Sequence, residues 1–315
     1  MNSERVGIVR VIVNPTAGRG RGKGCAESIA RVLEGAGIQH EVEFSRGPAH
    51  ATQLALGAQA RGSRAVVAVG GDGTASEVVN GLALAHSGTG AIGPLVVLPI
   101  GSGNDFAAIT GSPREPSDLP RVLQDPRRQL LDLGTAKLQG PGLEELRYFD
   151  NTIGVGFEAR VNRAAARIRR LRGVPLYLLA ALRALRSPGA MALEIEWTDE
   201  AGEGHSVSGD FLMVTAGNGP RSGGGFFLTP EARHDSGTLE LGLVETLSRR
   251  AILALLPKAL KARHTTHPAV RIERCTGFRL CSTEPLSLHA DGELLQAEPT
   301  AIEVAVVPGC LELWT

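Results

Sequence analysis

Three polar, glycine-containing turns carry the residues of this 315-residue chain that are best suited to chemistry. The most informative is the turn at residues 70–74, Gly-Gly-Asp-Gly-Thr, which follows a β-branched run and precedes a helical stretch. Its glycines let the backbone approach a ligand, and the amino end of a helix offers about half a positive charge to a phosphate. Asp72 beside a phosphate is favourable only where it meets a magnesium ion or a hydroxyl group. The segment predicts a phosphate site, against the simpler alternative of a tight strand-to-helix turn.

Two further turns have a similar composition. Residues 14–18 are Asn-Pro-Thr-Ala-Gly, and residues 99–106 are Pro-Ile-Gly-Ser-Gly-Asn-Asp-Phe. Both follow strand candidates, and ligands of open parallel sheets bind beyond the carboxyl ends of the strands. We therefore expect the three turns to converge on one site. Thr74 and Glu77 have capping-box spacing, which predicts that the helix after the second turn begins at Thr74.

The elements that position these turns alternate regularly from residue 6 to about residue 130. Short β-branched runs at residues 7–13, 65–69 and 95–98 are separated by helical stretches rich in alanine and leucine. This alternation is typical of βαβ units. It predicts an α/β N-terminal domain with a Rossmann-like parallel sheet.

After residue 133 the pattern changes to short strands separated by glycine, proline and aspartate. This predicts a largely antiparallel, β-sandwich-like C-terminal domain. The strand candidates are residues 191–197, 211–215, 239–244, 270–273, 278–282 and 286–288, and the helical stretches are residues 160–186 and 248–261. Two final strand candidates, residues 301–307 and 311–314, either end this domain or return to the first.

The amino-acid composition limits which partners the protein attracts and in which cellular compartment it is expected. The 33 basic residues are balanced by 33 acidic ones, so no global field attracts nucleic acid. The four cysteines lack CxxC spacing, which favours a reducing cytosol and a role as small core residues. We expect neither a signal peptide nor a membrane span of roughly 20 apolar residues. A lipid would then be reached from the cytoplasm, by peripheral contact at the inner face of the membrane.

Better-known phosphate motifs do not fit. A Walker A loop requires four residues between its first glycine and a Gly-Lys-Ser/Thr group, whereas Gly22-Lys23 lies one position too close to Gly18 and precedes Gly24. No GxGxxG follows the first strand, and the HRD and DFG sequences of protein kinases are absent. The phosphate site must be of another design.

The three turns together resemble the diacylglycerol kinase catalytic domain family, which includes soluble bacterial lipid kinases and sphingosine kinases. The resemblance rests on Asn-Pro-x-Ala-Gly at residues 14–18, Gly-Gly-Asp-Gly-Thr at 70–74, and Pro-x-Gly-Ser-x-Asn-Asp-Phe-Ala at 99–107. It continues in the same order through residues 151–159, 218–225, 230–240 and 291–293.

This resemblance implies that residues 1–131 form a nucleotide-binding domain, completed by a returning strand at 301–315, and that residues 132–300 form a β-rich lipid-substrate domain. ATP, with Mg²⁺, would be held between them. The expected nucleotide contacts are Asn14, Pro15, Thr16, Ala17, Gly18, Ser45, Gly70, Gly71, Asp72, Gly73, Thr74, Glu77 and Ser102. Asn104, Asp105 and Asp291 would face the acceptor hydroxyl. Asp72 and Glu293 would be catalytic, Glu293 as the general base.

Three positions depart from the family pattern. Ser102 stands where many members have threonine, and Glu158 stands where aspartate is usual. Ser236 replaces an aspartate that often helps to bind a structural magnesium, which leaves Asp235 as the candidate metal ligand.

Residues 160–186 contain eight arginines and no acidic residue. Apolar residues recur among them at helical spacing. The stretch therefore predicts either an amphipathic surface that meets anionic lipid headgroups or a solvated face whose leucines pack on the sheet. His264 and His267 could share a metal ion, but a polar connection without nearby ligands explains them better. His289 could influence Glu293, or could simply occupy a strand position.

The function expected from the resemblance is transfer of the γ-phosphate of ATP to a hydroxyl group of a membrane lipid, with diacylglycerol as the first candidate. Two alternatives stay open: a soluble kinase like the NAD kinases, which also carry GGDGT, and a catalytically silent nucleotide- or lipid-binding regulator. The expected partners are a membrane lipid and an anionic membrane surface, without nucleic acid. A homodimer is left open.

Overall fold

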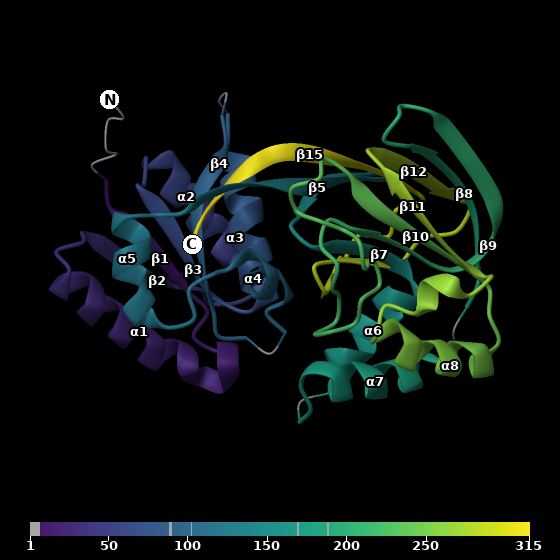
Figure 1. The fold of residues 1–315 in the computed structure, drawn as a ribbon, viewed down its shortest axis with the longest axis horizontal. Coiled ribbons are helices and arrows are strands. Elements are labelled where there is room, and N and C mark those ends of the chain that lie inside the picture. The colour runs from purple at the N-terminus through teal and green to yellow at the C-terminus, as the bar shows by residue number, and fades with distance from the viewer. Residues whose placement is uncertain (1–6, 88–89, 102, 169, 188) are drawn as a thin grey trace. The chain divides into compact units, whose positions relative to one another are not determined.

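The structure, a computed structural model, describes residues 7–87, 90–101, 103–168, 170–187 and 189–315 (Figure 1). The chain divides into two compact units. Unit 1 comprises Met1–Leu131 and Gly309–Thr315, and unit 2 comprises Asp132–Pro308. The C-terminal segment that belongs to unit 1 therefore begins at Gly309, later than the residue 301 expected for the returning strand.

Unit 1 contains a parallel sheet in the order β4-β3-β1-β2. The C-terminal end of β15 extends this sheet, because Leu311 pairs in parallel with Ile92 of β4. The strands are β1 (Val9–Val13), β2 (His40–Phe44), β3 (Ala65–Gly70), β4 (Ile92–Pro99) and β15 (Ala301–Trp314). Every residue of β1 and β3 is buried, as expected for strands covered on both faces. The Rossmann-like parallel sheet is confirmed.

Helices cover both faces of this sheet (Figure 1). They are α1 (Ala17–Gly35), α2 (His50–Ala60), α3 (Asp72–Ala85), α4 (Asp105–Thr110) and α5 (Leu119–Gln124), with a 3₁₀ turn at Pro116–Asp118. Helix α1 packs with α5, and α2 packs with α3. Val11, Val67 and Leu98 are fully buried in the core between the sheet and α1.

Unit 2 is built on antiparallel strands, which confirms the second sheet type expected from the sequence. One path runs β14-β13-β7-β9-β8-β12-β15, β10 pairs with β9 and β11, and β5 pairs with β6 and β15. The strands are β5 (Arg128–Gly140), β6 (Leu143–Phe149), β7 (Thr152–Gly156), β8 (Met191–Thr198), β9 (Gly204–Gly217), β10 (Leu239–Glu245), β11 (Val270–Cys275), β12 (Gly277–Ser282), β13 (Leu288–Ala290) and β14 (Glu293–Leu294).

Three helices lie together on one side of the unit 2 sheet (Figure 1): α6 (Phe157–Ala165), α7 (Gly173–Ala184) and α8 (Arg249–Ala259). The stretch predicted as helical at residues 160–186 is thus two helices, and Pro175 lies in the first turn of the second. A 3₁₀ turn follows at His264–Thr266. None of the helices in the described part of the chain is long and apolar enough to cross a membrane.

Several element boundaries differ from the expectations. The helix predicted to begin at Thr74 begins at Asp72, with Gly71 as its N-cap and no side-chain cap. The two final strand candidates are one continuous strand, β15, although Pro308 lies within it. Strands β2, β5, β6 and β7 were not predicted, because β2 and β6 carry several charged residues and β7 is short and rich in glycine.

Candidate active site

The three glycine-containing turns of unit 1 meet beyond the ends of β1, β3 and β4. Asn14 Nδ2 of the first turn donates to Thr74 Oγ1 of the second at 3.2 Å. Asp72 Oδ2 of the second turn accepts from the backbone N–H of Asn104 in the third at 2.6 Å. Arg21 Nη2 donates to the Ile100 carbonyl at 3.2 Å. The convergence expected from the strand order is present.

Glycine is required where the second and third turns touch. A Cβ on Gly101 would lie 2.4 Å from the Gly71 Cα, so a side chain there would force the two backbones apart. Gly18 has a φ of +60°, and a Cβ there would lie 2.5 Å from the Ile100 carbonyl oxygen. These contacts keep the backbone of all three turns within reach of a common ligand.

Asp72 joins the second turn to the third. Its carboxylate accepts from the backbone N–H groups of Asn104 at 2.6 Å and Phe106 at 3.4 Å. The side chain is half-buried, and its carboxylate lies where the second turn meets the third. Magnesium in phosphate sites is typically held by one or two carboxylates and by the phosphates themselves. Asp72 fits the role of a single protein ligand to such an ion.

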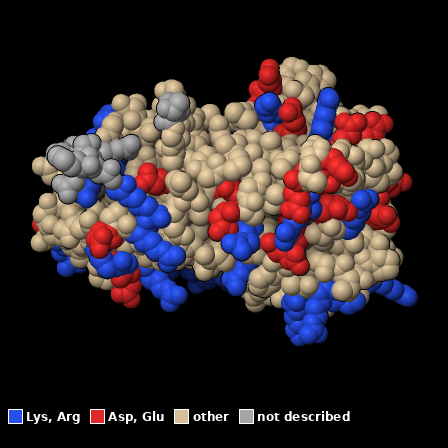
Figure 2. Space-filling view, turned by 45° about the horizontal axis from the view of Figure 1, so that its top comes forward, with Lys and Arg blue, Asp and Glu red and all other residues tan. Residues whose placement is uncertain are grey.

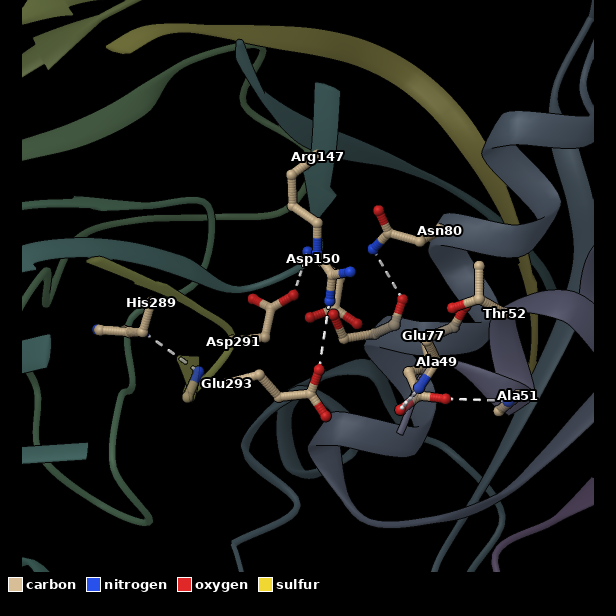
Figure 3. Close-up of polar contacts among 12 residues, drawn as sticks. Ala49, Ala51, Thr52, Glu77, Asn80, Arg147, Asp150, His289, Asp291 and Glu293 are labelled. Atoms are coloured by element: carbon tan, nitrogen blue, oxygen red, sulfur yellow. Dashed lines mark hydrogen bonds and ion pairs between the residues drawn. The ribbon is translucent and has the colours of Figure 1, made fainter. Parts of the chain in front are cut away.

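Glu77 of α3 bonds the start of the preceding helix, α2, and does not cap its own helix. Its carboxylate oxygens accept from the backbone N–H groups of Ala49 and Ala51, both at 3.0 Å (Figure 3). These two amides lie at the amino end of α2, where helix N–H groups lack partners within the helix. Glu77 is only 9% exposed. The predicted capping box with Thr74 is therefore wrong, and the Glu77 carboxylate stabilises α2.

The remaining expected residues of unit 1 lie in or beside the turns. Asn14 Oδ1 accepts from the backbone N–H and the hydroxyl of Thr16. Asn104 has a φ of +58°, and its Oδ1 accepts from the Gly101 N–H at 3.0 Å. Asp105 is buried in the first turn of α4, and Ser45 is buried directly after β2. Ser102 lies outside the described residues.

In unit 2, the segment Asp291-Gly292-Glu293 forms a tight hairpin between β13 and β14. Ala290 and Glu293 are paired across it, and Asp291 and Gly292 have φ values of +49° and +81°. Two consecutive residues with positive φ are the hallmark of a type I′ hairpin turn. Asp291 and Gly292 are therefore the two turn residues, and Glu293 is the first residue after the turn.

The Asp291 side chain anchors this hairpin to the strand β7. Its carboxylate accepts from three consecutive backbone N–H groups, those of Asp150, Asn151 and Thr152, at 3.1, 2.9 and 2.9 Å. Figure 3 shows the Asp291 side chain beside Asp150. Asp291 is 7% exposed. Three amide donors to a buried carboxylate give Asp291 a structural role in placing the residue that follows.

Glu293 projects from the hairpin toward Arg147 of β6. Its Oε2 lies 3.3 Å from Arg147 Nη2, and the Glu293 side chain is 38% exposed (Figure 3). Arg147 itself is 16% exposed, so the pair sits at the edge of the unit and not in its core. The contact fixes the direction of the carboxylate, and the side chain remains partly exposed.

Behind the hairpin lies a buried polar chain. Ser222 Oγ donates to Glu158 Oε1 at 2.6 Å, Glu158 Oε1 lies 3.2 Å from His289 Nε2, and His289 Nδ1 accepts from the Gly292 N–H. Burial raises the pKa of the Glu158 carboxyl, but the His289 ring and the hydrogen bonds outweigh burial and hold that pKa below its ordinary value. The chain therefore ends on the backbone of the Asp-Gly-Glu turn.

A narrow apolar cavity borders the same turn. It has a volume of about 90 Å³, and its polar lining is confined to Glu158, Asn162, Tyr177 and Ser222. A Cβ on Gly292 would lie 3.8 Å from Asn162 Oδ1 and 3.9 Å from the Tyr177 hydroxyl oxygen. A second apolar cavity, of about 80 Å³, shares with the first the walls Phe157, Met213, Leu228, Leu256 and Ala259. Unit 2 thus has a polar group of side chains at the mouth of an apolar space.

The candidate metal ligand Asp235 has a different partner. Its carboxylate pairs with Arg233 at 3.0 Å, and the Ser236 hydroxyl is bonded within the same loop. In the described part of the chain, one group of three His, Cys, Asp or Glu residues has ligand atoms close enough for a metal ion, and it is Asp199, Glu203 and His205. Neither Asp235 nor the pair His264 and His267 belongs to it.

Sequence reasoning missed Arg147, Tyr177 and Ser222. Arg147 lies in a strand that was not predicted, and Tyr177 lies in a leucine-rich stretch that gives no sign of a polar site. A serine before Gly-Gly-Gly carries no signal of a buried carboxylate partner. His289 was considered as an influence on Glu293, and it does bond the turn that carries Glu293.

Two family descriptions match the chain in succession. Residues 8–136 match the "Diacylglycerol kinase catalytic domain", and residues 151–315 match the "YegS C-terminal NAD kinase beta sandwich-like domain". A "Diacylglycerol kinase" of Mycobacterium tuberculosis (strain ATCC 25618 / H37Rv) is 29% identical over 99% of this chain and 96% of its own length. A "Probable lipid kinase YegS-like" of Xanthomonas campestris pv. campestris (strain 8004) is 30% identical over 83% of this chain and 82% of its own.

A solved structure has the same fold. The crystal structure of a diacylglycerol kinase from Bacillus anthracis str. Sterne matches with a TM-score of 0.69 and 20% identity, covering 97% of this chain and 96% of that chain. Both family matches agree with the order of the motifs at residues 14–18, 70–74, 99–107 and 291–293. The chain belongs to the diacylglycerol kinase catalytic domain family, with a C-terminal domain of the YegS type.

Proposed function

We propose that this protein is an ATP-dependent lipid kinase that transfers the γ-phosphate to a hydroxyl group of a membrane lipid, with diacylglycerol as acceptor and phosphatidic acid as product. The observation that carries the proposal is the apolar cavity beside the Asp-Gly-Glu hairpin. Its lining is apolar except for a few side chains, two of which, Asn162 and Tyr177, lie next to Gly292. An acceptor with a hydroxyl group beside an apolar tail has this same distribution of polarity.

The nucleotide is assigned to unit 1. The meeting of three amide-rich turns supports this, because backbone N–H groups and helix amino ends bind phosphate without a charged side chain. Asp72 is the residue suited to hold Mg²⁺, which would neutralise charge between the phosphates. Glu77 and Asn104 act indirectly in this scheme, since their side chains are bonded to backbone groups of unit 1.

Glu293 is assigned as the general base. It accepts the proton of the acceptor hydroxyl while that oxygen forms a bond to the γ-phosphorus, and the bond from this phosphorus to the bridging oxygen breaks to release ADP. The ion pair with Arg147 directs the carboxylate, and Asp291 holds the turn. Asp291 itself is a positioning residue, because its oxygens already accept three N–H bonds.

The YegS-type domain description mentions NAD kinases, so a soluble nucleotide acceptor is the second candidate. The side chains that line the two apolar cavities disfavour such a nucleotide acceptor. A nicotinamide dinucleotide carries two phosphates and two sugars, and a mainly apolar lining without a basic side chain other than His264 offers few partners for them.

The test is to incubate the protein with labelled ATP and Mg²⁺ in three mixtures: mixed micelles with diacylglycerol, a total lipid extract, and NAD. The proposal expects label in a lipid whose mass corresponds to phosphatidic acid, and none in the dinucleotide. The Glu293→Gln variant is the control for contaminating kinases. Labelled NADP would support the second candidate, and absence of any labelled acceptor would support a silent regulator.

A further inference from the structure

The loop at residues 233–238 has a serine, Ser236, where the family often has an aspartate that helps to bind a structural magnesium. The loop lies in unit 2 between β9 and β10, and Arg233, Asp235 and Ser236 are exposed on it. Magnesium in proteins is bound at about 2.0 to 2.1 Å by oxygen atoms of carboxylates, carbonyl groups and water. The partners of the loop's oxygen atoms therefore decide whether such an ion fits.

Four polar atoms of the loop surround the Ser236 hydroxyl oxygen. The carbonyl oxygens of Arg233 and Thr238 lie 3.0 and 3.1 Å from Oγ, and both are acceptors for the hydroxyl. The Thr238 hydroxyl oxygen lies 3.1 Å from the same atom, and the Thr238 N–H donates to it at 3.4 Å. A serine hydroxyl has one proton and two lone pairs. Its proton serves the two carbonyl groups, and its lone pairs face the two donors of Thr238.

The Ser236 hydroxyl thus performs in this loop the task of an ion, which is to hold oxygen atoms of separate residues together. It joins the carbonyl groups of Arg233 and Thr238, which are five residues apart. An ion bound to both carbonyl oxygens would lie between them, where the hydroxyl already bridges them. A third carbonyl group of the loop, that of His234, accepts from the Asp132 N–H at 2.6 Å. All three carbonyl groups have hydrogen-bond donors within the protein.

Two carboxylates at this loop also have partners. Asp235 pairs with Arg233 through both oxygens, at 3.0 and 3.2 Å, and a guanidinium group in this place repels a divalent cation. Asp132, which is 3% exposed, accepts from the Gly237 N–H at 2.7 Å. Acidic and basic side chains lie among one another over much of the surface that Figure 2 shows, so an exposed carboxylate paired with an arginine is ordinary in this protein. The donor set of the loop does not fit a magnesium ion.

Hydrogen bonds within unit 2 join this loop to the Asp-Gly-Glu hairpin. The Gly237 N–H bonds Asp132, and Asn218 Nδ2 donates to the carbonyl groups of Asp132 and Asp150, both at 2.8 Å. The Asp150 N–H in turn bonds the Asp291 carboxylate. An ion in the loop would make the support of this hairpin depend on the magnesium concentration, whereas a hydroxyl group supports it at any concentration.

We infer that the Ser236 hydroxyl fastens the loop at residues 233–238 in place of a structural magnesium, so that unit 2 folds without a divalent ion there. This role is separate from the chemistry assigned to Asp72 and Glu293. Under the proposed function, the magnesium requirement of the enzyme is that of the nucleotide alone.

The test is thermal unfolding without nucleotide, in excess EDTA and in millimolar MgCl₂. A site filled to 100 times its dissociation constant raises the melting temperature of a protein of this size by about 5 °C. The wild type should shift by less than about 1 °C between the two buffers. Ser236→Ala should melt about 2 °C below the wild type by the same amount in both buffers, since it loses hydrogen bonds and no ion. After dialysis, metal analysis of the wild type should find far less than one magnesium per chain.

Ser236→Asp should acquire the response that the wild type lacks. Its carboxylate has no proton for the carbonyl groups of Arg233 and Thr238, so the variant should melt lower in EDTA and gain about 5 °C with MgCl₂. The matched control is Thr266→Asp. The Thr266 hydroxyl also donates to a carbonyl group three residues earlier, that of Arg263 at 3.2 Å, in an exposed turn of unit 2. This control should not respond to magnesium.

The Asp72→Asn variant separates the two units. A magnesium-dependent rise of about 5 °C in the wild type that Asp72→Asn retains, or one magnesium per chain after dialysis of both proteins, would place an ion in unit 2 and overturn the role of Ser236. A rise that Asp72→Asn abolishes belongs to unit 1 and supports that role. If folded Ser236→Asp melts at one temperature in both buffers, the hydroxyl does not stand in for an ion. None of these measurements uses kinase activity, so the proposed function can fail without them and they can fail without it.

Discussion

Glu158 Oε1 lies 3.2 Å from His289 Nε2, with both side chains buried in unit 2. His289 Nδ1 accepts from the Gly292 N–H, and Nε2 on the other side of the ring is the atom beside the carboxylate. A buried carboxylate is thereby tied to the backbone of the turn that presents Glu293. Glu158, which stands where the family usually has aspartate, thus helps to hold the turn that carries the proposed base, Glu293.

This relationship makes a quantitative prediction for His289→Ala. The change leaves the Glu158 carboxylate buried without its ring partner, which should lower the free energy of unfolding by roughly 1 to 3 kcal/mol. In the double variant Glu158→Gln/His289→Ala no buried charge remains, so the loss should be clearly smaller than the sum of the two single losses. Urea unfolding of the wild type, of Glu158→Gln, of His289→Ala and of the double variant gives the coupling free energy between the two side chains. Strictly additive losses would mean that the two side chains do not interact.

Glu240 makes stability depend on pH. Burial raises the pKa of its carboxyl from the ordinary 4.5 to about 7, and its side chain accepts from the Glu231 N–H at 2.7 Å. Between these two pKa values the unfolded chain loses its proton while the folded chain keeps it, so the folded state loses stability as pH rises from about 4.5 to about 7. Below that window both states are protonated and the contribution vanishes.

Glu240→Gln removes this dependence while it retains an acceptor for the Glu231 N–H. The variant should gain thermal stability relative to wild type as pH increases from 5 to about 8, with most of the gain below pH 7. The measurement is the difference between the two melting temperatures at each pH. A difference that stays constant across this range would show that Glu240 titrates with an ordinary pKa.

Asp72→Asn tests the second turn of unit 1. Asparagine keeps one acceptor oxygen for the Asn104 N–H and loses the charge assigned to magnesium, so the variant should fold and melt within a few degrees of wild type. Its turnover should fall at least 100-fold at saturating Mg²⁺. Asp125→Asn, an exposed carboxylate of the same unit, is the matched control. Turnover near the wild-type value in Asp72→Asn would remove Asp72 from the proposed chemistry.

The sequence was informative wherever one local pattern dominated. The strands β1, β3 and β4 are apolar runs ending in glycine or polar turns, so their type, their parallel arrangement and the convergence of their turns could be predicted. Strand β6 could not, because four of its seven residues are charged or polar side chains suited to a solvated hairpin. Its partner β5 is recognisable only through the pairing with β6 and β15.

Side-chain roles were less predictable than backbone elements. Thr74 and Glu77 have the spacing of a capping box, yet Glu77 bonds two amides of α2, which are far along the chain. Asp291 looked like a substrate ligand, but three amides from residues 150–152 occupy its carboxylate. Such contacts depend on tertiary packing, so no local pattern encodes them. The resemblance already favoured Glu293 over Asp291 as the base, and the structure adds the physical reason, because three amides bond the Asp291 carboxylate.

That distinction sharpens the prediction for Glu293→Gln. Glutamine keeps the shape of the side chain and an acceptor for Arg147, so the hairpin and the melting temperature should be preserved. ATP affinity should also be preserved, because the nucleotide is assigned to the turns of unit 1. Turnover should fall by roughly 10² to 10⁴, the usual contribution of a positioned general base.

The matched control for this variant is Glu303→Gln, an exposed carboxylate of β15 that also pairs with a basic residue, Lys137. Single-turnover rates with diacylglycerol separate chemistry from product release, and the loss in Glu293→Gln should appear in the chemical step. A loss below about threefold would place the base elsewhere. Asp72 would then be the candidate, because the Asp291 carboxylate is already committed to three backbone amides.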